Sequence, residues 1–131
     1  MVFIKTKQSL EKHIGLKQIA EEIDSPAAFT AKILQKLVHS GLLESIRGPR
    51  GGFKINKKFG KIYLRDIVES IDGDALLSQC VLGFEECSKD SPCAVHYKFV
   101  HIRSELKETL SETSIDEIAG NVSSGSAFLK L

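Results

Sequence analysis

Residues 16–55 read LKQIAEEIDSPAAFTAKILQKLVHSGLLESIRGPRGGFKI, and this stretch decides the fold. Apolar residues recur at helical spacing in its first part, which predicts a short amphipathic helix over 15–24. Ser25 is a good N-cap and the proline after it suits a first helical position, so a second helix is expected over 26–40, ended by Gly41. Two short helices joined by a tight turn are typical of a helix-turn-helix.

The spacing of the apolar residues changes after this second helix. Short apolar runs flank the Gly/Pro cluster Arg47-Gly-Pro-Arg-Gly-Gly-Phe53, which predicts a β-hairpin with a wide, flexible tip. A helix-turn-helix followed by a basic-tipped hairpin is a winged helix, so the fold class expected is mainly α with a small β-hairpin. The second helix is expected to bury one apolar face, made by Phe29, Ile33, Leu34, Leu37 and Val38.

A long helix is expected in the second half of the chain. A short helix closed by Asp72-Gly73 comes first, residues 75–91 have no clear period and are read as an irregular loop, and an apolar stripe then predicts a helix from Cys93 to about Glu112. Its apolar seam needs a partner, either its own domain or a second copy. Ser114 opens a last short helix with a capping box. The expected organisation is a winged-helix region over 1–73, a cysteine-containing loop over 74–93, the long helix and the short C-terminal helix over 94–120, and a disordered tail over 121–131.

Length and composition exclude several classes of protein. The chain has 131 residues, of which 42% are hydrophobic, so it is long enough to bury the core of one compact domain. No apolar run approaches the roughly 18–20 residues that span a bilayer, and residues 1–12 lack the features of a signal peptide. Three cysteines without an export signal favour free thiols, a metal site or redox chemistry in a reducing compartment over a disulfide scaffold.

The net charge of +1 hides an asymmetry along the chain. Residues 1–65 carry 13 basic and five acidic side chains, a net charge of +8, and residues 66–131 carry five basic and 12 acidic ones, a net charge of −7. A basic half beside an acidic half indicates a surface for a polyanion such as nucleic acid. The alternative is a chance clustering of solvated charges.

A winged helix would meet double-stranded DNA through the start of its second helix. Side chains there reach base edges in the major groove, and the helix dipole favours a phosphate. Basic residues of the hairpin would clamp the DNA backbone or enter the minor groove. The alternative is a winged helix that binds protein. The DNA-binding residues expected are Ser25, Ala27, Ala28, Thr30, Ala31, Lys32, Arg47, Arg50 and Lys54.

A second candidate site is the series Cys80, Cys87, Cys93 and His96, which lies within 17 residues. Three thiolates and an imidazole complete a four-coordinate site for zinc or for an iron–sulfur cluster. The spacing is not the paired Cys-x2-Cys of zinc ribbons, which disfavours zinc. The alternative is that these residues are ordinary free thiols and a surface histidine. The remaining histidines, His13, His39 and His101, are expected to be surface or packing residues.

Enzyme chemistry is not indicated. A cysteine nucleophile needs an oriented base, an oxyanion site and a substrate pocket, and a lone Cys93/His96 pair on one helix supplies none of the rest of such a set. The glycines at 48–52 join two hairpin strands and do not follow a strand as a phosphate-binding loop does. The sequence therefore predicts a protein that is not an enzyme.

Several motifs together resemble the Rrf group of bacterial regulators, which contains the BadM, IscR, NsrR and CymR proteins. They are Ile19-Ala20, the stretch from Ile33 through Leu37 to Gly41-Leu42, the wing motif 47–53, and the three-cysteine loop before a long helix. The resemblance covers about residues 13–118. It implies a cytoplasmic, dimeric winged-helix transcription regulator that binds a two-fold-related operator and dimerises through the long helix. It also implies an iron–sulfur cluster on the cysteines, because several members carry one, and His96 matches the fourth ligand of the IscR type.

The sequence departs from the family pattern at three places. Six residues separate Cys80 from Cys87 where the IscR pattern has five, so the cluster type, [2Fe–2S] or [4Fe–4S], stays open. Residues 1–12 are shorter than the N-terminal helix of the family, so we expect a truncated or misassigned start, or the loss of contacts made by that helix. Ala31 stands at the position of a specificity-tuning glutamate, so that member's operator is not transferred.

The sequence therefore predicts a homodimeric DNA-binding transcription repressor whose affinity responds to redox, iron–sulfur or nitric oxide status. Two alternatives stay open. One is a cluster-free regulator that uses thiols or a small-molecule signal, and the other is a winged-helix protein-interaction module.

Overall fold

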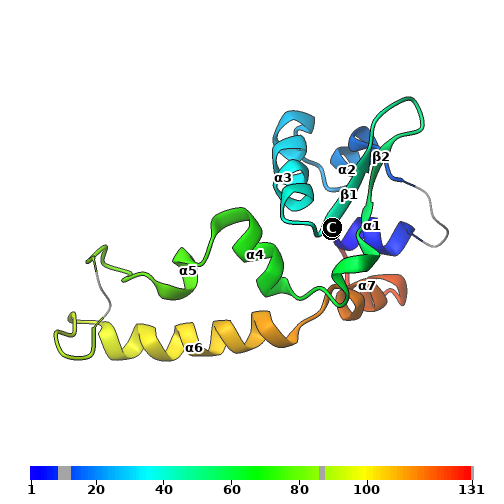
Figure 1. Cartoon of the computed structure of the whole chain (residues 1–131). Helices are drawn as coiled ribbons and strands as arrows, with labels where there is room; N and C mark the ends of the chain where they lie inside the picture. Colours follow the sequence, from blue (N-terminus) through cyan, green and yellow to red (C-terminus); the bar gives the residue numbers. More distant parts are fainter. Residues whose placement is uncertain (9–12, 86–87, 131) are drawn as a thin grey trace. The chain divides into compact units, whose positions relative to one another are not determined.

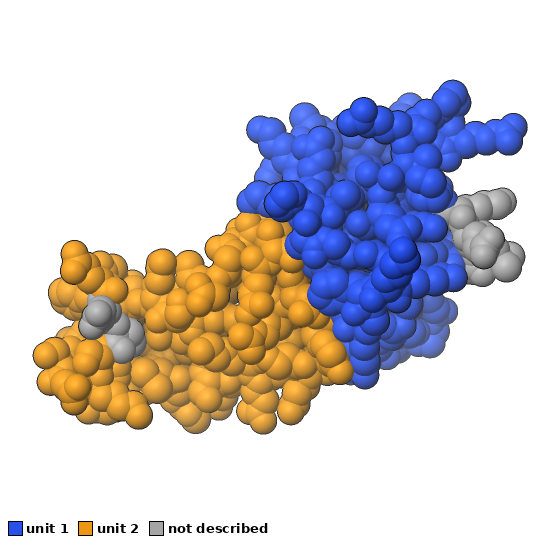
Figure 2. Space-filling view, in the orientation of Figure 1, with its two compact units in different colours: residues 1–62, 114–131 blue, residues 63–113 orange. Residues whose placement is uncertain are grey.

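The computed structural model describes residues 1–8, 13–85 and 88–130, and the chain forms two compact units. Unit 1 contains Met1–Ile62 and Ser114–Leu131, and unit 2 contains Tyr63–Thr113 (Figure 2). The elements, labelled in Figure 1, are α1 (Val2–Lys7), α2 (Leu16–Glu22), α3 (Ala27–His39), β1 (Leu43–Ile46), β2 (Gly52–Ile55), the 3-10 turn η1 (Lys57–Phe59), α4 (Leu64–Asp72), α5 (Ala75–Ser78), α6 (His96–Glu112) and α7 (Ile115–Ser123).

Helices α2 and α3 of unit 1 form the predicted helix-turn-helix, and α3 ends where the sequence indicates. Gly41 has a φ of +80°, a conformation that glycine adopts without steric cost. Its amide donates to the carbonyl of Val38, and the amide of Leu42 donates to the carbonyl of Leu37, both at 3.0 Å. These two bonds make a Schellman motif, which satisfies carbonyls that the helix itself leaves unpaired.

The start of α3 differs from the expectation. Pro26 occupies the N-cap position, and no side chain caps the helix, so the prediction of a Ser25 cap is wrong. The Ser25 hydroxyl instead accepts a hydrogen bond from the hydroxyl of Thr30 at 3.1 Å. Because Thr30 is buried, its hydroxyl needs a partner inside the protein, and Ser25 is turned inward to supply one.

The apolar face of α3 is narrower than predicted. Leu34 and Leu37 are buried and Ile33 is half-buried, but the side chain of Phe29 is 61% exposed. The side chain of Phe29 therefore lies outside the core although its neighbour Thr30 is buried, and the expectation that Phe29 is a core residue is wrong.

The wing is a two-stranded antiparallel hairpin of β1 and β2, as the sequence predicts. Its register pairs Leu43 with Ile55 and Ile46 with Gly52. An isolated bridge adds the backbone of Ile14 to the outer side of β2, opposite Phe53. The segment that leads into α2 thus holds the second strand of the hairpin near the wing tip.

The core of unit 1 joins the two ends of the chain. Helix α1 packs on α7, and α2 packs on α3. The side chain of Ser114 caps α7 by accepting a hydrogen bond from the amide of Glu117 at 3.2 Å, which confirms Ser114 as the N-cap, the first half of the predicted capping box. The largest side chains with almost no exposure in this unit are Ile4, Leu37, Leu42, Leu43 and Ile115.

Unit 2 consists of α4 and α5 packed along α6. Helix α4 ends at Gly73, with a φ of +73°, as predicted. Two expectations for this unit are wrong. Residues 75–78 form the short helix α5 where an irregular loop was expected, because Leu77 is buried and fixes this turn. Helix α6 begins at His96 and not at Cys93, because the carbonyl of Cys93 accepts from the amide of His96 in a turn before the helix.

Within the described part of the chain, no helix is long and apolar enough to cross a membrane.

Candidate nucleic-acid interface

The outer face of α3 is polar and carries one stripe of exposed residues. Ala28, Lys32, Gln35 and His39 are all exposed and recur at intervals of three or four residues, so they lie along one side of the helix. The opposite side carries the buried Leu34 and Leu37. A helix held in this way presents a continuous polar ridge of about three turns to a partner.

The nine expected DNA-binding residues do not all lie on the surface. Ala27, Ala28, Lys32, Arg47 and Arg50 are exposed, whereas Ser25, Ala31 and Lys54 are half-buried. Thr30 is only 4% exposed, and its hydroxyl donates to Ser25. Its position is structural, so we leave Thr30 out of the contact surface that we infer below.

The wing carries its two arginines at its tip, between the strands. Arg47 and Arg50 lie in the loop that joins β1 to β2. Lys54 lies on β2, directly across from Glu44 on β1, and its Nζ is 3.3 Å from Oε2 of that glutamate. The charge of Lys54 is therefore partly neutralised within the hairpin, and the two arginines are left as the main cations of the wing.

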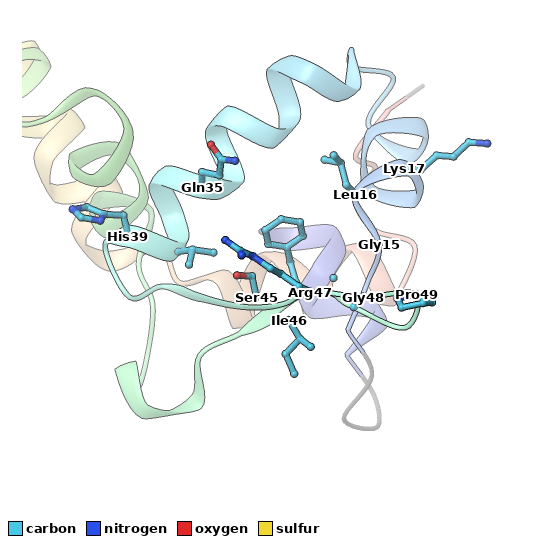
Figure 3. Close-up of a pocket in the computed structure, with 14 residues that line it drawn as sticks. Gly15, Leu16, Lys17, Gln35, His39, Ser45, Ile46, Arg47, Gly48 and Pro49 are labelled. Atoms are coloured by element: carbon cyan, nitrogen blue, oxygen red, sulfur yellow. The ribbon is translucent and has the colours of Figure 1, made fainter.

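A groove with a volume of about 720 Å3 lies between α3, the start of α2 and the wing. Figure 3 shows Gln35 projecting from α3 and Arg47 directed from the wing toward α3, while Lys17 points away from the groove. His39 lines the same groove at the end of α3. The lining residues are Gly15, Leu16, Lys17, Gln35, Val38, His39, Ser45, Ile46, Arg47, Gly48, Pro49, Gly51, Gly52 and Phe53.

Sequence reasoning did not include Lys17, Gln35 and His39 of this lining, because it placed the contact surface at the start of the second helix and on the wing. A signal for two of them was present: Gln35 and His39 follow Ala28 by seven and 11 residues, a spacing that keeps residues on one face of a helix. Lys17 lies beside the groove only through the tertiary arrangement of α2 and the wing, and its side chain points away from it.

The wing contains two glycines, Gly51 and Gly52, at which any other residue would clash with a neighbouring backbone. A Cβ atom on Gly51 would clash with the carbonyl oxygen of Ile46, and one on Gly52 would lie 2.5 Å from that of Ile14. Gly52 also has a φ of +146°. These two positions need glycine because backbones approach closely there.

The charge of the two units follows the sequence asymmetry. Residues 1–62 and 114–131 of unit 1 carry 13 basic and seven acidic side chains, a net charge of +6. Residues 63–113 of unit 2 carry five basic and 10 acidic side chains, a net charge of −5. Electrostatic attraction to a polyanion therefore belongs to the unit that contains α3 and the wing.

Unit 2 brings two of the three cysteines together. Backbone hydrogen bonds from Leu82 lower the pKa of the Cys80 thiol below its usual range, burial opposes this shift, and Phe84, the thiol of Cys93 and the charge of Arg103 add to the lowering. Cys80 is 9% exposed. Its sulfur thus sits among groups that stabilise a thiolate.

Arg103 of α6 also fixes the segment that precedes Cys80. Its guanidinium donates to the carbonyl of Gln79 at 2.5 Å and to that of Ser78 at 3.4 Å. His96 is buried at the start of α6, with its ring edge-on to Tyr97 at a centroid distance of 5.1 Å. Cys87 lies outside the described residues, and among those that the structure describes no three histidine, cysteine or acidic side chains are grouped to hold a metal.

A helix-turn-helix with a basic wing and a polar recognition helix defines the chain as a winged-helix protein of the DNA-binding class. The comparisons with known proteins place it more narrowly. A family model described as "Rrf2: Iron-dependent Transcriptional regulator" matches residues 1–121, and the chain belongs to this Rrf2 family. The predicted family and fold class are confirmed.

Three relatives illustrate the likeness. A candidate HTH-type transcriptional regulator of Aquifex aeolicus is 33% identical over 111 residues, 82% of this chain and 76% of the relative. The HTH-type transcriptional regulator IscR of Xenorhabdus nematophila is 24% identical over 113 residues, 86% of this chain and 68% of that protein. The structure of CymR, the global cysteine regulator of B. subtilis, has a TM-score of 0.73 at 25% identity and covers 91% of this chain and 86% of its own.

These relatives are transcription regulators and not enzymes, in agreement with the prediction made from the sequence. The chain is a transcriptional regulator of the Rrf2 family, similar to IscR and CymR.

Proposed function

We propose that this protein is a homodimeric repressor that binds a two-fold-related operator in the cytoplasm through α3 and the wing. The observation that carries the DNA contact is the groove between Gln35 of α3 and Arg47 of the wing, on the unit with a net charge of +6. In this interface the stripe from Ala28 to His39 enters the major groove, and Arg47 and Arg50 contact the phosphate backbone or the minor groove.

Fluorescence anisotropy with a random DNA duplex at several salt concentrations tests the contact. We expect steep weakening as salt rises, because each phosphate neutralised releases counterions. Arg47→Ala or Arg50→Ala is expected to weaken binding and to reduce the steepness of the log–log salt plot by about one. Lys107→Ala on α6 removes one exposed charge from unit 2 and is the matched control.

Absence of DNA binding at low salt would reject this proposal and favour a winged-helix module that binds protein. An equal loss of DNA affinity in Lys107→Ala and Arg47→Ala would show that a charge on the wing contributes no more to DNA binding than a charge on unit 2. Repression itself is tested by transcription from a template that carries a selected operator, since a repressor lowers the yield of transcript in proportion to its occupancy.

The dimer contact that we propose lies on α6 and α5. Ile102 and Leu76 are 53% and 57% exposed there, and they border an apolar groove of about 530 Å3 together with Phe99 and Leu106. Large apolar side chains exposed along one helix face mark a surface that another protein surface covers. A second copy of α6 supplies a seam of the same kind, as an isologous contact requires.

Sedimentation equilibrium tests the dimer. Ile102→Glu is expected to convert the protein to a monomer, because it places a charge in the centre of an apolar contact. Ser104→Glu introduces the same charge at an exposed position on α6 outside the apolar stripe and is expected to leave the dimer intact. Dimers of equal stability in both variants would contradict an α6 seam.

We further propose that Cys80, Cys87, Cys93 and His96 hold an iron–sulfur cluster. The nearness of the thiols of Cys80 and Cys93, with backbone groups that stabilise a thiolate on Cys80, supports the donor set. A cluster supplies sensitivity to oxidants and to nitric oxide when it is bound. Arg103 ties the segment before Cys80 to α6, so a rearranged loop changes the first turns of that helix.

Iron and sulfide content of anaerobically purified protein tests this ligand set. We expect a brown protein with visible charge-transfer absorption and a loss of colour in Cys80→Ser and Cys93→Ser, with Ser88→Ala as the loop control. A colourless, metal-free product after reconstitution would reject the cluster. The nearness of the two thiols would then favour a second candidate function, a sensor in which an oxidant such as hydrogen peroxide joins them as a disulfide and is reduced to water.

A further inference from the structure

A cavity of about 310 Å3 lies inside unit 1, away from the groove that faces DNA. Its walls come from α1, α2 and α3, with Phe3, Ile19, Ile33, Leu34 and Leu37 among them. Ile23 and Phe29 stand at its exposed side, 42% and 61% exposed. The cavity thus lies directly behind the recognition helix and opens beside large apolar side chains.

The lining of this cavity selects for an uncharged ligand. Every side chain that lines it is apolar except those of Ser25 and Thr30, and no charged side chain is among those that the structure describes there. Met1 also lines the cavity, and burial lowers the pKa of its amino group to about 6, so this group is mainly neutral at pH 7. An apolar cavity gives water few partners, so it is poorly hydrated and takes up apolar molecules readily. An ion would lose its hydration there without compensation.

Apart from the amino group of Met1, the hydroxyls of Ser25 and Thr30 are the polar groups of this apolar space. Thr30 is buried and donates to Ser25, which leaves the pair with acceptor lone pairs and one hydroxyl hydrogen. A ligand with one hydroxyl, amine or carbonyl group can pair with them, and the rest of the molecule contacts aliphatic side chains. At the packing density of protein interiors, the cavity accommodates on the order of a dozen non-hydrogen atoms.

We propose that this cavity is a binding site for a small, neutral, mainly apolar molecule with one hydrogen-bonding group. The site is distinct from the DNA interface and from the cysteines, and its occupancy does not depend on a cluster. Because Ile33, Leu34 and Leu37 belong to α3, a bound molecule contacts the helix that carries Lys32 and Gln35 on its other side. Ligand and DNA therefore act on the same element from opposite faces.

The experiment is a fluorescence titration of the full chain with 1-aminoanthracene, a neutral aromatic amine that brightens in apolar surroundings. The chain has no tryptophan, so the protein contributes little background emission. We expect saturable binding with one site per chain. We expect 1-octanol to displace the bound probe. At the same concentration, sodium octanoate is expected to displace at least tenfold less probe, because its carboxylate carries a charge.

Two matched variants locate the site. Ile33→Phe adds volume at the cavity wall and is expected to weaken probe binding at least tenfold, with circular dichroism unchanged. Leu76→Ser alters the apolar groove of unit 2 and is expected to leave the affinity within twofold. Should Ile33→Phe fail to fold, Thr30→Val takes its place, with an expected loss of about threefold from the missing hydroxyl.

Three results would overturn the proposal. They are the absence of saturable binding, a loss of binding in Leu76→Ser with none in Ile33→Phe, and equal displacement by 1-octanol and octanoate. The second result would assign the probe to the groove of unit 2.

Discussion

The backbones of Ile14 and Phe53 pair through two hydrogen bonds, each 2.9 Å long, in which each residue donates to the other. Ile14 directly precedes the segment that opens α2, and Phe53 lies on the second strand of the wing. The bridge therefore fixes the wing relative to the helix-turn-helix. A recognition helix and a wing that contact one DNA duplex need such a fixed spacing, because both must fit grooves of set width.

The close approach at this bridge predicts a large cost for Gly52→Ala. Its Cβ would lie 2.5 Å from the carbonyl oxygen of Ile14, in a backbone conformation with a φ of +146°. We expect the free energy of unfolding to fall by about 2–4 kcal/mol through the clash and the strain. Chemical denaturation measures this loss.

Gly120→Ala is the control for that substitution. Gly120 lies within α7, and a Cβ there meets no atom within 4 Å. Alanine is the better helix former, so stability is expected to rise by up to about 1 kcal/mol. A Gly52→Ala protein as stable as the wild type would mean that the backbone of Ile14 moves aside without a loss of free energy of unfolding.

Thr30→Val and Lys32→Ala separate a structural residue from a contact residue. Thr30 is buried and donates to Ser25, so valine is expected to cost about 1 kcal/mol of stability and to change DNA affinity less than twofold. Lys32 is exposed on α3, so its loss is expected to weaken DNA binding with little effect on unfolding. The free energy of unfolding and the DNA affinity, both measured on both variants, test whether the two residues have these separate roles. The reverse pattern would place Thr30 at the DNA.

Gln35 is expected to read sequence and not only charge. A glutamine side chain pairs with the two hydrogen-bonding atoms of adenine in the major groove, a contact worth about 1–3 kcal/mol of discrimination. Selection of operators from a random duplex library is therefore expected to lose one adenine preference in Gln35→Ala. Gln18→Ala changes an exposed glutamine on α2 and is expected to keep the selected sequence. If Gln35→Ala selects operators with the same adenine preference as the wild type, Gln35 does not contact that base.

The thiol of Cys80 is expected to react at lower pH in the folded chain than in the unfolded one. Hydrogen bonds from Leu82, and with them Phe84, Cys93 and the charge of Arg103, lower its pKa. A group with a lowered pKa stabilises the fold above its unfolded pKa, and this contribution is lost as pH falls through the folded value. The rate at which iodoacetamide alkylates Cys80 is measured against pH in metal-free protein, folded in buffer and unfolded in urea. The midpoint of this pH profile is expected to lie at lower pH in the folded protein than in urea.

Arg103→Ala and Arg103→Lys resolve the source of this shift. Alanine removes the positive charge, so the midpoint is expected to rise, whereas lysine keeps the charge and is expected to hold the midpoint closer to the wild-type value. Equal midpoints in folded and unfolded protein would show that the surroundings of Cys80 do not stabilise its thiolate.

The sequence was a good guide where one local rule determines the structure. Gly41 ends α3 because a left-handed residue is needed there, and the glycines of the wing mark the hairpin for the same kind of reason. It failed where a distant partner decides. Phe29 fits the apolar period of α3 but has no core in front of it, and Ser25 turns to the buried Thr30 instead of capping the helix.

The candidate site was predicted in outline from composition and order. The arginines of the wing follow from their place between two short apolar runs, and Lys32 follows from its place on the second helix. Lys17 was missed because the groove is formed by three elements at once, and no spacing within one element reveals it, whereas the helical spacing of Gln35 from Ala28 was a signal that was not used. The cysteine series marked a region of interest, and the nearness of Cys80 to Cys93 depends on how the chain returns to α6.

The winged helix is encoded at both ends of the chain. The amide of Ile115 donates to the carbonyl of Ile62 at 2.9 Å, so the chain leaves unit 1 and re-enters it at neighbouring points. Unit 2 is thus an insertion in the sequence of a DNA-binding fold, not an appendage to it. A truncation after α6 would spare every cysteine and yet take Ile115 and Ala119 out of the winged-helix core, so the DNA-binding half is the part that a C-terminal lesion damages first.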